Sequence, residues 1–370
     1  MSVDVSFELA DPTLAEHRWR LACERDSQAH PPLVAELYAE IGGDSVEAVG
    51  GYLYLRAEDS DDDRNDATPN DRDRLDEEWL PRMEALATAL DGLEPDAVDE
   101  RGWAVALGVR IDEWAAIAQG VHRDVLGPAG RAAAAFTDAF VAHFGEGRRE
   151  DAQALIAAPD SRDARRAVAL WELSRILRSQ GSRLSATFGP TGGQRVYMQG
   201  LDRAREEFPD TTPGRRQDVP TWREDRAMVT RSIRAAAMQP DAASPLEAQR
   251  RRDALETELG AATGNGAVEG LRAVLPAARA QALALDALSE PAERLVAAAR
   301  SMWLRIGRHL ESRGALAGAG DVFYFTRAEL IAALDGGDGP AHDEIAARRT
   351  EHAAFEAAVP PAILWSGEAS

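Results

Sequence analysis

Apolar residues recur at every third or fourth position along most of this chain, and this spacing is typical of helices that bury one face. Between residues 77 and 178 such stretches follow one another with only short interruptions. The first stretch places four large apolar side chains on one face: Trp79, Met83, Leu86 and Leu90. Alternating or short apolar runs that favour strands occur around Tyr52 and Phe323. We therefore expect a mainly α-helical protein with a few short strands.

A change of pattern between Arg300 and Leu330 predicts the end of one helix and the start of another. An apolar helical face leads up to Gly314, which stands where a helix C-cap needs a positive φ. The run Val322–Phe325 is too short for a helix and rich in strand-forming residues, so we expect it to be extended. Thr326 and Glu329 have the spacing of a capping box, which begins the next helix.

These patterns divide the chain into four parts. Residues 1–56 form an N-terminal segment with a short strand, and residues 57–76 form an acidic loop that contains Asp61, Asp62 and Asp63. Acidic runs without a fixed geometry are usually solvated, so we expect no metal in this loop. Residues 77–200 and 201–370 form two helical subdomains.

Composition narrows the possible classes of function. The net charge is −21, which argues against a nucleic-acid partner because phosphate backbones need a basic face. All 42 basic residues are arginine, so a lysine nucleophile is excluded. The single Cys23 cannot form an intrachain disulfide. No run approaches the ~20 apolar residues of a membrane helix, and the acidic start lacks a signal-peptide core. We therefore expect a cytoplasmic protein with no membrane partner.

Several strings of residues resemble one protein family, and they occur in the family's order. The strings are His30–Leu33 (HPPL), Ala169–Arg175 (ALWELSR), Pro220–Asp225 (PTWRED) and Asp321–Thr326 (DVFYFT), the last preceded by Gly307, Arg308 and Leu310. They resemble the substrate-binding middle domain of phosphotransferases of the phosphoenolpyruvate-synthase and rifampicin-phosphotransferase type. The resemblance covers roughly residues 19–363.

The resemblance implies that the chemistry is divided among several parts. In that family an ATP-grasp domain splits ATP, a swivelling domain carries a phosphohistidine, and a third domain binds the acceptor, which is pyruvate, a phenol or an antibiotic hydroxyl. This chain resembles the third domain alone, and Pro360–Ile363 is similar to the linker that leads to the phosphohistidine domain. We therefore expect this chain to bind no cofactor and no metal. Separate ATP-grasp and phosphohistidine subunits would use ATP and Mg²⁺, and the chain is not expected to be active alone.

The resemblance and the residue types together suggest where the acceptor would bind. Acceptor catalysis needs a base or a charge that steers the hydroxyl onto the phosphohistidine. We assign this role to three residues: His30, His122 and Asp286. We expect five further residues to contact the acceptor: Trp19, Trp114, Leu285, Leu288 and Trp303. Near Asp286 we expect a cleft with apolar walls and few charges. A helical histidine is also a common structural residue, and tryptophans at this spacing also form ordinary cores.

Two departures from the family pattern concern the acceptor machinery. Phe208–Asp210 stand where the family usually carries YGHR, and only Asp286 remains of its EDHxxxID strip. The sequence contains no GxSxG, HExxH or Walker-type phosphate loop that would indicate another chemistry. We therefore expect the substrate-binding subunit of a split ATP-dependent phosphotransferase, which acts on a hydroxylated, largely apolar small molecule such as a phenol. The alternatives are a non-catalytic binding or scaffold protein, and an enzyme with different chemistry, on the same helical domain.

Overall fold

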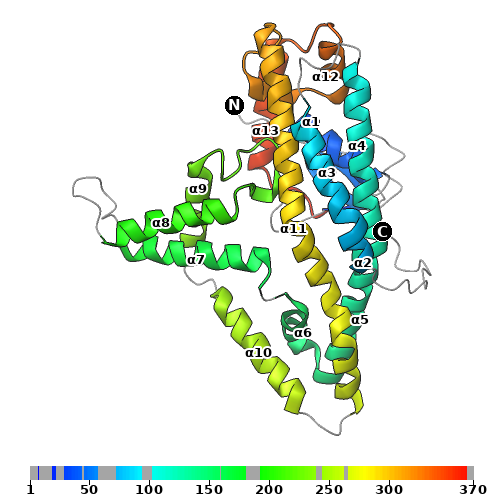
Figure 1. Ribbon diagram of the computed structural model, residues 1–370, viewed down its shortest axis with the longest axis vertical. Helices are drawn as coiled ribbons and strands as arrows, with labels where there is room; N and C mark the ends of the chain where they lie inside the picture. The colour runs from blue at the N-terminus through cyan, green and yellow to red at the C-terminus, as the bar shows by residue number, and fades with distance from the viewer. Residues whose placement is uncertain are drawn as a thin grey trace.

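One long helix, α11 (Gly266–Ser312), runs nearly the full length of the molecule (Figure 1). At 1.5 Å per residue its 47 residues extend over about 70 Å. Pro276 and Pro291 lie inside it. In the computed structural model, the described residues are 7, 19–21, 29–43, 46–56, 72–93, 102–158, 160–180, 192–238, 244–261 and 266–364.

The other helices surround α11. Their bounds are α1 (Pro32–Gly42), α2 (Arg72–Arg74), the π-helical turn η3 (Leu75–Trp79), α3 (Leu80–Asp91), α4 (Gly102–Val121), the π-helical turn η5 (His122–Leu126), α5 (Gly127–Phe144), η6 (Glu146–Arg148), α6 (Arg149–Ile156), α7 (Arg162–Gln180), α8 (Gly192–Glu207), η8 (Pro213–Arg215), α9 (Arg226–Ala237), α10 (Pro245–Ala261), the 3-10 helix η9 (Ala319–Tyr324), α12 (Arg327–Leu334) and α13 (His342–Ala357). Helices α3 and α5 pack along α11, while α7, α8 and α9 project sideways as an arm (Figure 1).

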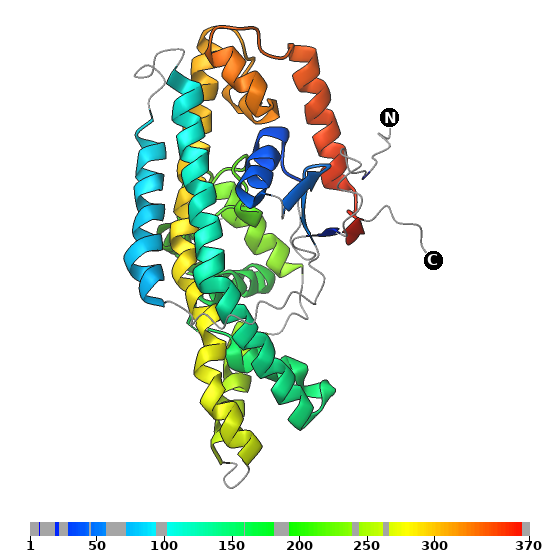
Figure 2. The same cartoon turned by 90° about the vertical axis from the view of Figure 1, so that its right-hand side faces the viewer.

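A small antiparallel sheet lies beside α1 and α13, on the side turned away from α3 (Figure 2). Its four strands have the order β2 (Val46–Val49), β3 (Tyr52–Arg56), β1 (Trp19–Leu21) and β4 (Ile363–Leu364). The pairing of Trp19 with Leu364 joins segments from opposite ends of the described chain. Tyr52 and Tyr54 are buried, and their hydroxyls donate to the carbonyl oxygens of Phe355 and Pro361. The strand predicted around Tyr52 is confirmed.

The apolar faces of the helices form separate cores. The largest core contains the predicted face of Trp79, Met83, Leu86 and Leu90, and it extends over α1, α4, α11, η9 and α12. A second core joins α5, α6 and α10 to the first half of α11. The arm has its own core, in which Phe208 and Trp222 are completely or almost completely buried. The mainly α-helical fold predicted from the sequence is confirmed.

The local signals around Gly314 are confirmed, but the strand predicted at Phe323 is wrong. Helix α11 ends at Ser312, and Gly314 has a φ of 75°. Thr326 and Glu329 form the predicted capping box of α12. The segment around Phe323 is instead the 3-10 helix η9, because the Asp321 carboxylate accepts the backbone N–H of Gly318 at 3.1 Å and closes a tight turn.

The helical part that follows the acidic loop begins at Arg72, earlier than the sequence indicates. Residues 57–71, with Asp61–Asp63, lie outside the described residues, as do residues 181–191 and Cys23. Contacts between α7 and α9 cross the predicted subdomain boundary at residue 200. None of the described helices is long and apolar enough to cross a membrane.

Candidate functional site

A buried polar cluster lies where α1, α13 and the loop before α9 meet α11. We call it the His30 cluster, and its members are His30, Tyr38, Arg216, Gln217, Asp218, Trp303, His352 and Glu356. Arg216, Gln217 and His352 are at most 7% exposed, whereas Asp218 is half-buried and Glu356 is exposed. Buried polar groups of this kind need partners, and those partners fix the geometry of the cluster.

The backbone around His30 is held by the turn between β2 and β3. The backbone N–H of His30 donates to the Gly51 carbonyl oxygen at 2.8 Å. Gly51 has a φ of 79°, and a Cβ atom there would lie 2.3 Å from the His30 carbonyl oxygen. Only glycine allows this approach, so the turn places the imidazole directly before α1, which begins at Pro32.

Arg216 ties the loop to α13 through two carboxylates. Its Nε donates to Asp218 at 3.0 Å, its Nη2 also contacts Asp218, and its Nη1 contacts Glu356. These carboxylates raise the pKa of Arg216 although burial opposes the charge. A buried guanidinium bound in this way positions the loop.

Gln217 connects the same loop to α11. Its Oε1 accepts the indole N–H of Trp303 at 2.8 Å, and its backbone carbonyl accepts from Arg300 at 3.0 Å. The contact with Trp303 fixes the orientation of the amide, so that Nε2 is the donor end. Among the described residues this buried Nε2 forms no hydrogen bond of good geometry, but the Gln217 side chain interacts with the Tyr38 hydroxyl and lowers the pKa of Tyr38, against the larger effect of burial.

The ring of His30 is neutral near pH 7. Burial, with smaller contributions from the charges of Arg216 and His352, lowers its pKa to about 4, although Asp218 acts in the opposite direction. Its Nδ1 is buried and has no partner in the described part of the chain. The ring lies edge-on to Tyr38 with 5.2 Å between centroids, and burial raises the pKa of Tyr38 to about 12.

His352 lies on α13 next to His30. Its Nε2 is 3.0 Å from the Ala29 carbonyl oxygen, and because a carbonyl only accepts, Nε2 must carry the hydrogen. Its Nδ1 is 4.0 Å from a Glu356 carboxylate oxygen. His352 therefore links α13 to the backbone immediately before His30.

A cavity of about 250 Å³ opens beside this cluster. Its walls combine apolar and polar groups, which include Pro32, Phe355, His30, His352 and Arg348. Arg348 is held by Glu329 and Glu344, and its Nη1 also donates to the Tyr324 carbonyl oxygen at 2.8 Å. The cavity is large enough for a compact ring and lies against the neutral imidazole.

Three of the residues predicted to form the acceptor site come together here. Tyr38 contacts the ring of His30 on one side and that of Trp114 on the other, with 6.4 Å between the Tyr38 and Trp114 centroids. Trp303 joins the same cluster through Gln217. Both tryptophans also pack in the main core, so they support the cluster from the apolar side.

Asp286 lies elsewhere and has a structural role. It is on α11 about 25 Å before Trp303 along the helix axis, given a rise of 1.5 Å per residue. Its carboxylate accepts the backbone N–H of Arg162 at 2.6 Å and so caps the start of α7. Leu285 is 47% exposed, and Leu288 is buried in the main core.

The apolar cleft predicted near Asp286 is wrong. A hollow of about 370 Å³ is present there, but six of its eight lining residues are charged. Most of these charges come from the contact between α7 and α11, where the buried Glu293 pairs with Arg162 and Arg166. The sequence did not reveal that α7 would bring arginines to this part of α11.

The last two predicted site residues do not join the cluster through a described contact. His122 begins the π-helical turn η5 and is exposed. Trp19 lies in β1, and its side chain is outside the described residues.

Sequence reasoning missed six members of the cluster: Tyr38, Arg216, Gln217, Asp218, His352 and Glu356. A signal for three of them was present, since Arg216, Gln217 and Asp218 stand just before the PTWRED string. His352 had no local signal, because its contact with Ala29 joins positions far apart in the sequence.

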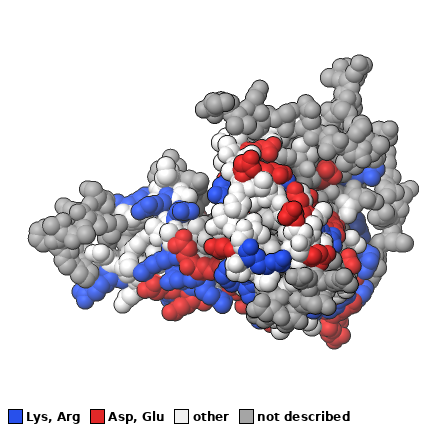
Figure 3. Space-filling view, turned by 90° about the horizontal axis from the view of Figure 1, so that it is seen from above, with Lys and Arg blue, Asp and Glu red and all other residues white. Residues whose placement is uncertain are grey.

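No group of His, Cys, Asp and Glu side chains within the described ranges is arranged to hold a metal ion. Basic and acidic side chains are interspersed on the face seen in Figure 3, although the net charge is −21. No protein-family model matches the sequence, and no curated protein matches it.

Proposed function

We propose that this chain is the acceptor-binding part of a phosphotransferase of the phosphoenolpyruvate-synthase type, and that the acceptor is a hydroxylated, largely apolar small molecule such as a phenol. The His30 cluster and the adjoining cavity are the proposed site. ATP, Mg²⁺ and the phosphohistidine are supplied by other parts of the system. The family strings support this proposal because PTWRED and DVFYFT both contact the surroundings of the cluster, through Glu224 to Arg300 and through Tyr324 to His352.

The observation that carries the proposal is the buried Nδ1 of His30, which has no partner in the described part of the chain and belongs to a residue that lines the cavity. Buried polar atoms rarely lack partners, so a small polar guest is expected beside it. The imidazole is neutral near pH 7, and in the tautomer that carries its hydrogen on Nε2 this Nδ1 is an acceptor. A hydroxyl can donate to such a nitrogen, and it therefore matches this atom.

His30 serves in this proposal as a hydrogen-bond acceptor that orients the hydroxyl. With a pKa of about 4 it is unprotonated at neutral pH but is a weak base. Phosphoryl transfer passes through a loose transition state, which depends more on alignment and charge stabilisation than on a strong base. Phe355 and Pro32 in the cavity wall would hold the apolar body of the acceptor.

Binding of matched ligands tests the site without any partner protein. We expect 4-ethylphenol to bind more tightly than 4-ethylanisole, in which the hydroxyl hydrogen is replaced by a methyl group. His30→Ala should weaken phenol binding by about threefold to tenfold, the usual value of one hydrogen bond, and His122→Ala should leave it unchanged. Equal binding of the two ligands, or an equal loss in both variants, would show that the hydroxyl does not meet His30.

A second candidate is a binding protein that transfers no phosphoryl group. The observation in its favour is that Asp286, the remaining residue of the family's polar strip, is engaged as the cap of α7. The two candidates differ when labelled ATP and the ATP-grasp and phosphohistidine domains of a family member are added. Labelled phenol supports the transferase, whereas phenol binding without labelling supports the binding protein.

A further inference from the structure

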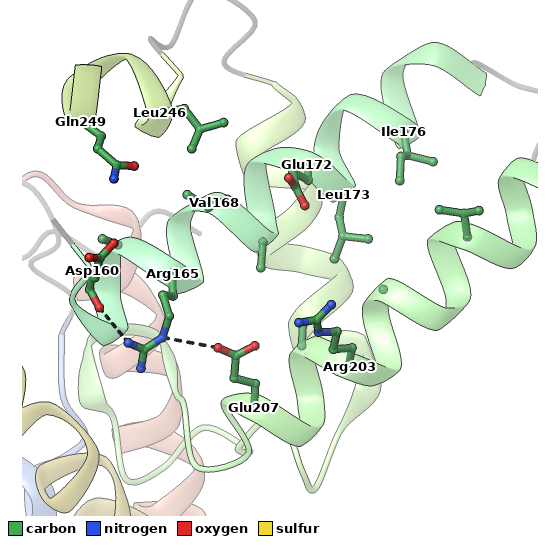
Figure 4. A pocket seen from close by; sticks show the side chains of 15 residues that line it. Asp160, Arg165, Val168, Glu172, Leu173, Ile176, Arg203, Glu207, Leu246 and Gln249 are labelled. Atoms are coloured by element: carbon green, nitrogen blue, oxygen red, sulfur yellow. Dashed lines mark hydrogen bonds and ion pairs between the residues drawn. The ribbon is translucent and has the colours of Figure 1, made fainter. Parts of the chain in front are cut away.

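The arm contains a second hollow that is separate from the His30 cluster. It lies between α7, α8 and the first turn of α10, and its volume is about 450 Å³ (Figure 4). This volume is within the range of small-molecule sites, which is roughly 300–1,000 Å³. We call it the arm groove.

The arm groove is built from two complete helical stripes. Helix α7 contributes positions three or four residues apart: Arg165, Val168, Ala169, Glu172, Leu173 and Ile176. Helix α8 contributes a matching set: Val196, Gly200, Arg203, Ala204 and Glu207. Such stripes normally close against each other along their length; here they meet at Leu173 and Gly200, while Val196 stays 54% exposed.

The floor of the groove is apolar and its helices approach closely. A Cβ atom at Gly200 would lie 2.7 Å from the Leu173 side chain, so glycine is what brings the two helices together at this point. Leu173 and Ala204 are buried in the core of the arm together with Phe208 and Trp222, and Ala169 packs against that core. The apolar surface that remains accessible to a ligand is therefore that of Val168 and Ala169, which are half-buried, and of the exposed Val196.

The charges at the rim favour a cation. Arg165 and Glu207 form a pair at 3.5 Å, and so they offset each other. The carboxylates of Asp160 and Glu172 and the guanidinium of Arg203 have no ion-pair partner in the described ranges. Glu172 and Arg203 border the apolar centre on opposite helices in Figure 4. The rim thus carries two unpaired carboxylates and one unpaired guanidinium. The protein as a whole has a net charge of −21, which attracts cations over a longer range.

We propose that the arm groove binds a cationic amphipathic small molecule, whose apolar body lies on Val168, Ala169 and Val196 and whose amine pairs with Glu172. This inference is independent of the proposed phosphotransferase function. It predicts that affinity follows the charge of the ligand when the apolar body is kept constant.

Three naphthalene probes with the same rigid body test the proposal: 1-naphthylmethylamine, 1-naphthylmethanol and 1-naphthoate. Calorimetry on the full chain should give a dissociation constant below about 1 mM for the amine. The amine should bind about threefold to fivefold more tightly than the alcohol, as one exposed ion pair allows, and the carboxylate should bind most weakly. Added salt should remove the preference for the amine.

Three variants locate the binding. Glu172→Gln should reduce the preference for the amine while leaving the alcohol unaffected, and Glu172→Lys should reverse the preference toward the carboxylate. Ala169→Leu fills the floor and should weaken all three probes. Glu206→Gln removes an exposed carboxylate of α8 that does not line the groove, and it should change nothing.

The proposal is overturned if no probe binds at 1 mM, if the carboxylate binds best, or if the Glu172 variants leave the order of affinities unchanged. The Glu172 variants alter an exposed side chain, so they remain informative even if Ala169→Leu fails to fold.

Discussion

Acidification should destabilise this protein through His30, and the change can be isolated by replacing that residue. Burial lowers the pKa of His30 from 6.5 to about 4, so the unfolded chain binds the proton more tightly than the folded protein. As the pH falls below 6.5, protonation therefore favours the unfolded state. Below about pH 4 both states are protonated, and the loss is complete.

The linkage relation gives the size of this effect. For a shift from 6.5 to about 4, the free energy of unfolding falls by about 2 kcal/mol between pH 7 and pH 5, and by about 3 kcal/mol at pH 4. His30→Asn keeps a polar group near the position of Nδ1 and removes the titration. Between pH 7 and pH 5, the free energy of unfolding should therefore fall by about 2 kcal/mol less in this variant than in the wild type.

Urea unfolding followed by tryptophan fluorescence at pH 5, 6 and 7 measures this difference. His122→Asn is the matched control, because that histidine is exposed on η5 and should show the pH dependence of the wild type. An NMR titration of the imidazoles gives the pKa of His30 directly. A His30 pKa near 6.5, or equal pH dependence in the wild type and His30→Asn, would refute the reasoning on which the neutral acceptor rests.

Three further predictions concern other parts of the molecule. The isolated protein should neither hydrolyse ATP nor label itself, since it has no recognisable ATP-grasp or phosphohistidine sequence; label from ATP on this chain would contradict this. Glu293→Ala should cost about 3–5 kcal/mol in urea unfolding, because it removes the buried carboxylate that Arg162 and Arg166 share and leaves the buried Arg162 with only the exposed Glu290. Glu290→Ala, which removes only that exposed partner, should cost less than about 1 kcal/mol. Gly307→Ala should lower the free energy of unfolding by about 1–3 kcal/mol, because its Cβ would lie 2.1 Å from the Ala319 carbonyl oxygen. On the same helix, the Cβ of Gly270→Ala meets no atom within 4 Å, and that variant should gain about 0.5–1 kcal/mol. Equal effects of the two substitutions would contradict the close approach at Gly307.

Local chemistry made much of the fold predictable from the sequence. The Gly314 stop and the Thr326–Glu329 capping box depend on neighbours within one turn, and both are as predicted. The face of Trp79 and Met83 followed from helical spacing alone. The segment around Phe323 was mispredicted, because strand-forming residues specify a strand only when another strand is available, and here η9 packs against α11 instead.

The candidate site was less predictable because its contacts join distant positions. His30 and Trp303 were named from the sequence, but Gln217, which connects to Trp303, became visible only in the fold. The contact of Asp286 was unpredictable for the same reason, since a carboxylate on α11 meets the start of α7 only after the arm has docked. A linear pattern shows which residues can perform chemistry, but not which of them the tertiary contacts engage.

The two positions at which the sequence departs from the motifs that it resembles share a structural role. Phe208, at the start of the replaced YGHR string, is fully buried against Trp222, and the guanidinium of Arg162 lies 5.1 Å from its ring centroid. The backbone N–H of the same Arg162 donates to Asp286, and its side chain pairs with Glu293. Residues at the positions of both altered motifs are thus used to attach the arm to α11. For the function proposed above, the acceptor site is therefore expected at the His30 cluster, which within the described residues combines a cavity with the unpartnered Nδ1 of His30.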